Sequence, residues 1–166
     1  MGSNNRRDGY RREVTRVLVI DDEAPLRLLC RVNLEAAGMQ VFEAADGSSG
    51  IEAARTERPD VILLDVMMPE QDGWEVLEEL RDDERTHGIP IVFLTARAEL
   101  DDHARGLELG GLDYVTKPFN PVGLAELVQA VLDRVADGEG EQLRRERLAE
   151  LRRLGAGGVI APRSRR

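Results

Sequence analysis

The sequence predicts an α/β fold, a three-layer α/β/α sandwich built on a five-stranded parallel sheet. Two observations lead to this prediction. Five short apolar runs recur along the chain, and each is followed by a segment with apolar residues at helical spacing. A strand that is an unbroken apolar run is buried on both faces, which requires parallel strands with helices on each side of the sheet.

The predicted strands are short and rich in β-branched residues, and turn-prone residues such as Gly38 and Pro59 precede some of them. In chain order the strands are expected at Val17–Ile20, Gln40–Ala44, Val61–Leu64, Ile91–Leu94 and Tyr114–Thr116. The segments with apolar residues at i, i+3 and i+4 predict helices at Leu26–Leu34, Gly50–Ala54, Val76–Leu80, Leu100–Leu109 and Val122–Val135. Five βα units in this order predict a flavodoxin-like sheet with strand order 2-1-3-4-5.

Composition and charge limit the class of protein. The chain has 166 residues, of which 42% are apolar and 33% charged, which predicts one globular domain with additional ends. Residues 17–140 hold 27 acidic against ten basic side chains, so the body would repel nucleic acid and attract divalent cations. One cysteine, Cys30, excludes an internal disulfide, and no apolar run is long enough for a membrane span. We therefore expect a cytoplasmic protein.

The ends of the chain differ from its body. We expect a basic, flexible arm at 1–15, the α/β domain at 16–137, a linker at 138–140, an amphipathic helix at 141–154 and a disordered basic tail at 155–166. The short helix should dock on the domain, pair with its own copy in a homodimer, or fray. Because 26 residues cannot hold a complete DNA-binding domain, we expect none in the chain.

Lysine usage points to a phosphate site. The chain contains 22 arginines and a single lysine, Lys117, within Thr116-Lys117-Pro118-Phe119. A compact ammonium on a flexible stem can approach a phosphoryl group as a point charge, whereas the arginine guanidinium is a broad planar fork. A lysine retained in such a chain is therefore a candidate for a role that arginine does not fill.

Polar residues follow four of the predicted strands. Asp21 and Asp22 follow the first strand, Asp65 the third, Thr95 the fourth and Lys117 the fifth. In a doubly wound sheet the ligand site lies at the carboxyl ends of the strands, near the switch point between strands 1 and 3. We therefore expect these side chains to meet at one edge of the sheet.

Such a cluster suits phosphoryl transfer. Crowded carboxylates repel one another, and Mg²⁺ relieves this because it prefers oxygen ligands in octahedral geometry. With the charge partly neutralised, Asp65 could attack a phosphoryl donor and become an aspartyl phosphate. Lys117, the Thr95 hydroxyl and the Ala96 N–H could bind the phosphoryl oxygens.

With these residues in place, the chain resembles the receiver domain of a two-component response regulator, from about Val17 to Val135. The motifs are Asp21-Asp22-Glu23, Asp65-Val66-Met67-Met68-Pro69 with Asp72-Gly73, Thr95-Ala96 and Lys117-Pro118-Phe119. Thr95 follows Asp65 by 30 residues, and Lys117 follows Thr95 by 22. Each motif alone is weak, but the ordered set is highly specific.

The resemblance implies a role for each matching residue. Asp65 is the phosphoacceptor; Asp22, Asp65 and the Met67 carbonyl bind Mg²⁺ directly, and Asp21 acts largely through water. Thr95, the Ala96 N–H and Lys117 bind the phosphoryl group, and Tyr114 is the switch aromatic. The resemblance also implies a phosphoacceptor switch that is not an enzyme, beyond self-catalysed phosphoryl transfer and autodephosphorylation. A histidine kinase or histidine phosphotransfer protein would be its donor, and an unknown output protein its partner.

Other functions fit the sequence less well. A phosphate sink without an output of its own remains an alternative. A phosphohydrolase of the dehalogenase type would need an Asp-x-Asp nucleophile motif after the first strand, which Asp21-Asp22-Glu23 lacks. A flavin carrier would need a phosphate loop there, and two aspartates would repel the phosphate. A nucleic-acid binder would have to act through the arginine-rich ends alone.

Overall fold

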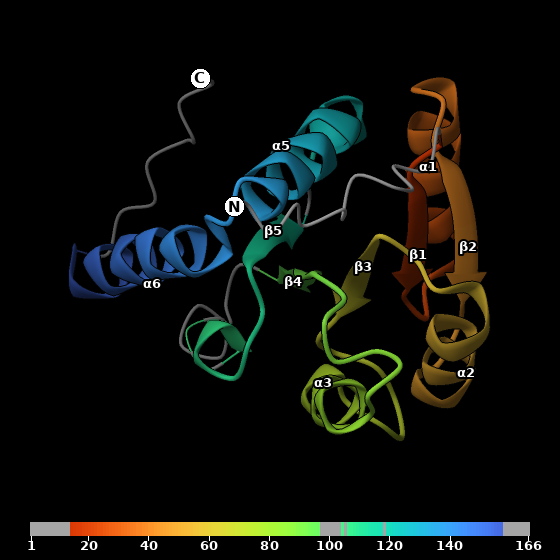
Figure 1. Cartoon of the computed structure of the whole chain (residues 1–166), viewed down its shortest axis with the longest axis horizontal. Coiled ribbons are helices and arrows are strands. Elements are labelled where there is room, and N and C mark those ends of the chain that lie inside the picture. The colour runs from red at the N-terminus through yellow and green to blue at the C-terminus, as the bar shows by residue number, and fades with distance from the viewer. Residues whose placement is uncertain (1–13, 97–103, 105, 118, 158–166) are drawn as a thin grey trace, which may run out of the picture.

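The computed structural model describes residues 14–96, 104, 106–117 and 119–157. Its centre is a sheet of five parallel strands in the order β2-β1-β3-β4-β5, as predicted from the sequence (Figure 1). The strands are β1 (Arg16–Ile20), β2 (Gln40–Ala44), β3 (Val61–Asp65), β4 (Ile91–Ala96) and β5 (Asp113–Lys117). Most of the expected arm at 1–15 and of the tail at 155–166 lies outside the described residues.

Three strands extend further toward their carboxyl ends than the apolar runs predicted. Asp65 pairs in register with Leu94 of β4, and Lys117 pairs with Ala96. Asp65 and Lys117 are therefore the last residues of their strands. Because a paired strand holds its backbone more rigidly than a loop does, the sheet itself positions both side chains.

The helices form the two outer layers. They are α1 (Ala24–Ala36), α2 (Gly47–Glu57), α3 (Gly73–Asp82), α5 (Leu124–Ala136) and α6 (Gly140–Gly157), with a 3₁₀ turn η2 at Pro121–Gly123. Of the helix expected at Leu100–Leu109, residues 104 and 106–108 are described and are helical. None of the helices among the described residues combines the length and apolar character needed to cross a lipid bilayer.

Alternation along the strands divides the core in two. Leu18 and Ile20 of β1 face α2 and α3, whereas Val17 and Val19 face α1 and α5. Successive side chains of a strand point to opposite faces, so an unbroken apolar run supplies both layers. All four side chains are fully buried, and each such side chain contributes about 1.5–3 kcal/mol.

Two helices begin before their first apolar residue because an aspartate caps each of them. The Asp46 carboxylate accepts a hydrogen bond from the Ser49 N–H at 2.8 Å, and the Asp72 carboxylate accepts one from the Glu75 N–H at 3.0 Å. Capping satisfies a backbone donor that has no partner within the helix. Consequently α2 and α3 each begin three residues before their predicted starts, Gly50 and Val76.

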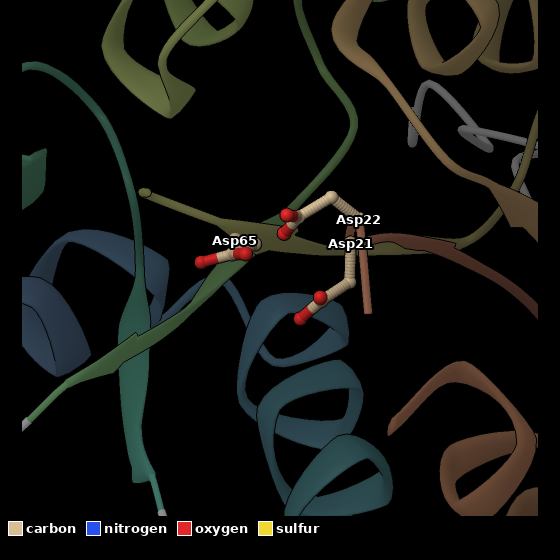
Figure 2. Close-up of side chains that lie close together, drawn as sticks. All are labelled: Asp21, Asp22 and Asp65. Carbon is tan, nitrogen blue, oxygen red and sulfur yellow. The ribbon is translucent and has the colours of Figure 1, made fainter. Parts of the chain in front are cut away.

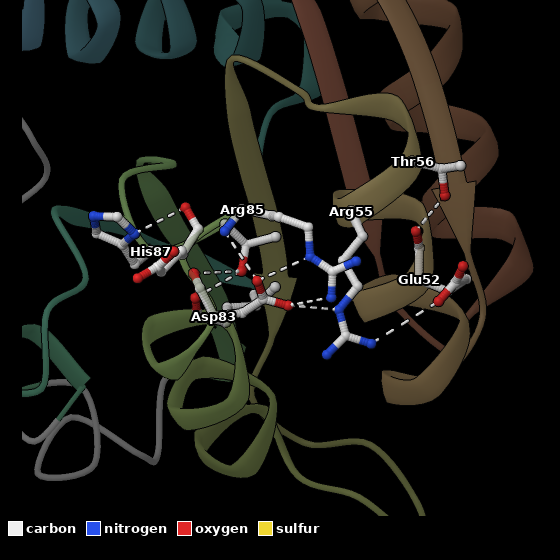
Figure 3. Close-up of polar contacts among 9 residues, drawn as sticks. Glu52, Arg55, Thr56, Asp83, Arg85 and His87 are labelled. Carbon is white, nitrogen blue, oxygen red and sulfur yellow. Dashed lines mark hydrogen bonds and ion pairs between the residues drawn. The ribbon is translucent and has the colours of Figure 1, made fainter.

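A polar cluster joins the ends of α2 and α3 (Figure 3). The Arg55 Nε donates to Asp83 Oδ2 at 2.8 Å, and Arg85 binds the same carboxylate through its backbone N–H and its guanidinium. Hydrogen bonds from Arg85 and Arg55 hold the pKa of Asp83 well below its usual range. His87 is exposed beside this cluster.

The segment after α5 is a tight turn. Gly138 has φ of +78°, its N–H donates to the Val135 carbonyl at 3.1 Å, and the Glu139 N–H donates to the Arg134 carbonyl at 2.8 Å. This pair of bonds is a Schellman motif, which favours glycine because the backbone is left-handed. The turn connects the end of α5 directly to the start of α6.

The helix α6 runs from Gly140 to Gly157, so the expectation of a helix limited to 141–154 and of disorder from 155 was wrong for residues 155–157. It contacts α5 and β5, and Leu143 and Leu151 are buried. Figure 1 shows α6 beyond β5, at the opposite end of the sheet from β2. Docking on the domain therefore supports a helix that would be marginal in isolation.

Arg58, which ends α2, offers a test of backbone strain. It has φ of 46° and ψ of 63°, a left-handed conformation that is costly for a residue with a Cβ. We expect Arg58→Gly to be more stable than Arg58→Ala by about 0.5–1 kcal/mol, since both lose the side chain but only glycine relieves the strain. Urea unfolding of the two variants measures the difference. An alanine variant as stable as the glycine variant would contradict this account.

Candidate functional site

Three carboxylates gather at the carboxyl edge of the sheet. Asp21 and Asp22 directly follow β1, and Asp65 ends the neighbouring strand β3. One oxygen from each carboxylate lies within 4.8 Å of the others, and Figure 2 shows the side chains converging from the two strands. Asp21 is fully buried and Asp65 is 3% exposed, whereas Asp22 is exposed. The structure thus brings together the three acids that the sequence singled out.

Local backbone donors orient the two buried carboxylates. Asp21 Oδ1 accepts a hydrogen bond from the Glu23 N–H at 2.9 Å, and Asp65 Oδ1 accepts one from the Met67 N–H at 3.1 Å. In both cases the donor lies two residues further along, the geometry of an Asx-turn. In each carboxylate the other oxygen, Oδ2, lies close to the Lys117 ammonium.

Gly73 supports Asp65 from behind. A Cβ at residue 73 would lie 2.6 Å from the Asp65 carbonyl oxygen and 2.7 Å from the Val66 Cα, both backbone atoms. Only glycine therefore allows the start of α3 to approach the end of β3 this closely. The sequence placed Gly73 in a motif, but only the packing reveals its role.

Lys117 places its ammonium among the acids. Its Nζ lies 2.8 Å from Asp21 Oδ2, 3.5 Å from Asp65 Oδ2 and 3.8 Å from Glu23 Oε2. Sequence reasoning missed the approach of Glu23, which depends on how α1 begins. Since the Glu23 side chain is 61% exposed, its attraction to Lys117 is weakened by solvent.

The electrostatics of the site are dominated by burial. Burial, and next the charge of Asp21, raise the pKa of Asp65 from 3.8 to about 7, against the lowering effects of Lys117 and the Met67 N–H. Burial alone would lower the pKa of Lys117, but the hydrogen bond with Asp21 and the charge of Asp65 raise it. The ammonium is therefore protonated, and it leaves the negative charge of the acids incompletely compensated.

This set of donors fits a hard divalent cation. Carboxylate oxygens are the ligands that Mg²⁺ prefers, and a partly exposed group such as Asp22 leaves room for the waters that Mg²⁺ retains. A cation would also favour the ionised form of Asp65, which burial and Asp21 disfavour.

The remaining predicted residues lie in different places. The side chains of Thr95 and Ala96 lie outside the described part, although their backbones pair with Thr116 and Lys117 at the same edge. The Met67 side chain is 61% exposed. Tyr114 lies three residues before Lys117 in β5, is 3% exposed and belongs to the apolar core, away from the carboxylates.

The raised pKa of Asp65 predicts a pH-dependent stability. Because the folded state holds this proton to higher pH than the unfolded state, the contribution of Asp65 is most favourable below pH 4 and is lost as the pH rises toward 7. Asn cannot ionise, so without divalent cation Asp65→Asn should gain stability over the wild type by on the order of 2 kcal/mol between about pH 5 and pH 8. Urea unfolding across this range measures the difference, and Mg²⁺ should reduce it. A difference independent of pH would refute the assignment.

Solved receiver structures superpose on this chain. The chemotaxis protein CheY4 of Vibrio cholerae is 33% identical and aligns with a TM-score of 0.67, covering 71% of this chain and 98% of its own. A putative response regulator from Chloroflexus aurantiacus is 30% identical, with a TM-score of 0.69, covering 74% of this chain and 100% of its own. Both entire domains are therefore contained within this fold.

Curated relatives are longer than this chain. The transcriptional activator protein IrlR of Burkholderia pseudomallei is 44% identical over 129 residues, which cover 78% of this chain and 55% of IrlR. The alkaline phosphatase synthesis transcriptional regulatory protein PhoP of Bacillus subtilis is 45% identical over 119 residues, or 72% of this chain and 49% of PhoP. The chain thus spans about half the length of the curated relatives it matches.

These relatives overturn the expectation about partners. We expected a receiver that acts without a DNA-binding domain, through a separate output protein or as a homodimer of its last helix. The relatives are transcriptional regulators, and only part of each is matched. The number of residues after α5 therefore supports no conclusion about DNA binding.

A family model described as the response regulator receiver domain matches residues 17–130, which include the three acids and Lys117. Receiver domains are phosphoacceptor switches that bind Mg²⁺ in an acidic pocket. The site geometry, the solved structures and the family model agree. This chain belongs to the response regulator receiver domain family.

Proposed function

We propose that this chain works as a phosphorylation-controlled response regulator in which Asp65 accepts the phosphoryl group. The observation that carries the proposal is the meeting of three carboxylates and Lys117 at one edge of the sheet, with Asp65 buried among them. The proposed ligands of Mg²⁺ are Asp22, Asp65 and the Met67 carbonyl, with Asp21 acting largely through water. When bound, Mg²⁺ would neutralise charge on the acids and on the transferring phosphoryl group.

In the proposed reaction an Asp65 carboxylate oxygen forms a bond to phosphorus, and the bond from phosphorus to the leaving group breaks, with its electron pair going to that group. The transferring group carries negative charge, so positioning and electrostatic stabilisation supply most of the catalysis. The Lys117 Nζ, 3.5 Å from Asp65 Oδ2, is close enough to bind a phosphoryl oxygen. Thr95 and the Ala96 N–H are the proposed ligands of the other oxygens.

The phosphorylated form would differ mainly in charge. The phosphoryl group of an aspartyl phosphate carries about −1.5 to −2 charges, which replace the single charge of the ionised Asp65 carboxylate. This charge would draw Lys117 away from Asp21, which it contacts at 2.8 Å, and would draw Thr95 inward. Tyr114 is the proposed aromatic that responds to these shifts. Water attack on phosphorus would reverse the modification, so the only reaction proposed is self-catalysed transfer and hydrolysis.

Phosphorylation by acetyl phosphate tests the acceptor. With Mg²⁺ present, we expect the mass of the intact wild-type protein to increase by one phosphoryl group, and that of Asp65→Asn to remain unchanged. Asp46→Asn is the matched control, because asparagine also caps a helix and this residue lies outside the site. Chelation of Mg²⁺ should abolish the reaction. Equal labelling of wild type and Asp65→Asn would place the acceptor elsewhere.

Replacement of the only lysine tests its role. Lys117→Arg keeps the positive charge but exchanges a point charge for a planar fork, which should misplace the charge relative to Asp65. We expect the rate of phosphorylation by acetyl phosphate to fall by about 10- to 100-fold while the fold is retained. The reverse exchange Arg31→Lys, on the exposed face of α1, should leave the rate unchanged. A wild-type rate in Lys117→Arg would mean that any cation suffices.

A further inference from the structure

The helix α6 is held on the domain by ion pairs to three separate segments. Glu146 pairs with Arg134 of α5 through two bonds of 2.7 and 3.1 Å. Arg147 lies 3.0 Å from Asp113 of β5. Arg152 lies 3.3 Å from Glu108 in the segment between β4 and β5. The helix therefore contacts α5, β5 and the segment between β4 and β5 at once.

The pair between Arg147 and Asp113 is the buried one. Asp113 is 2% exposed, and its Oδ1 faces the Arg147 Nε as well as the Tyr114 N–H, which donates to it at 2.8 Å. A buried carboxylate that loses a cationic partner is strongly destabilised. The contact of Arg147 with Asp113 therefore contributes to the docking of α6.

Apolar side chains of α6 complete its contact surface. Leu151 is buried in one cluster with Tyr114 and Leu107, and Leu148 packs against that cluster. Leu143 is buried in the cluster on the opposite face of the sheet, with residues of α5. The helix therefore spans the edge of the sheet and covers β5, an edge strand that would otherwise expose unpaired backbone groups.

The strand β5 connects this surface to the carboxylates. Its first two residues, Asp113 and Tyr114, lie under α6, and its last residue, Lys117, binds Asp21 and approaches Asp65. The buried Tyr114 ring is part of the apolar surface that Leu148 and Leu151 of α6 contact. A shift of β5 or of the Tyr114 ring would therefore remove contacts from α6.

We propose that the surface formed by β5 and α5 binds an amphipathic helix that carries an arginine opposite Asp113. The occupant of this surface is α6 of this chain. Phosphorylation of Asp65 weakens the docking of α6. The coupling, though not the docking surface itself, rests on the proposed function. By reciprocity, complete undocking of α6 must strengthen the binding of a phosphoryl group at Asp65 by the factor by which that group weakens the docking of α6.

Hydrogen–deuterium exchange of the full chain tests the coupling. Isolated helices of this length are marginal, so undocked α6 would exchange its amides faster. Beryllium fluoride with Mg²⁺, a stable phosphoryl mimic, should accelerate exchange across residues 143–151 by about 5- to 150-fold, the range of typical coupling energies. Asp65→Asn should show no acceleration. Unchanged exchange in protein whose intact mass confirms phosphorylation by acetyl phosphate would overturn the coupling and leave the proposed function intact.

A pair of α6 variants tests the docking surface without phosphorylation. Arg147→Gln should accelerate α6 exchange and raise the affinity for beryllium fluoride, by at most the factor by which beryllium fluoride accelerates α6 exchange in the wild type. The matched control Arg145→Gln, whose side chain is exposed and contacts its own helix, should do neither. If Arg147→Gln keeps its thermal transition and its α6 amides exchange at the wild-type rate, the proposed docking surface is wrong. If acetyl phosphate does not label Asp65, the proposed function and the coupling are both wrong. The comparison of Arg147→Gln with Arg145→Gln still tests whether α6 docks on this surface through Arg147.

Discussion

The crowding of two buried carboxylates around one ammonium is the constraint on which the site depends. Asp21 and Asp65 have almost no contact with solvent, yet they lie at the carboxyl ends of the adjacent strands β1 and β3 and face the same Lys117. Burial, and next the charge of Asp21, raise the pKa of Asp65 to about 7, and the charge of Lys117 offsets this only in part. The site is thus arranged to take up positive charge, which a bound divalent cation would supply.

The sheet fixes the positions of the charged groups relative to one another. The acids and Lys117 sit at strand ends that are paired in register, so their relative positions follow from the sheet and from close packing such as that of Gly73 against Asp65. The strand β5 is the element common to both regions of interest. It carries Lys117 at the acidic site and Asp113 under α6. This edge strand therefore connects the acidic site to the docking surface of α6.

Much of the fold could be predicted from local patterns. Period and length of the apolar runs indicated a buried parallel sheet, and the order of the strands followed from the connectivity of βα units. The predicted starts of α2 and α3 lie three residues too late, because they rest on apolar periodicity and not on the capping residues Asp46 and Asp72. Residues 155–157 were assigned to a disordered tail because glycine disfavours helix, an effect that docking of α6 outweighs.

By itself, the sequence determined the strand order, the residues at the carboxyl edge and the resemblance to the receiver family. These depend on residue type and on position relative to apolar runs, which the chain displays directly. Tertiary structure alone decided the burial of Asp65 and its raised pKa, the approach of Glu23 to Lys117 and the pairing of Arg147 with Asp113. These features arise between residues far apart in the chain, where desolvation and the direction of each side chain depend on how the layers pack.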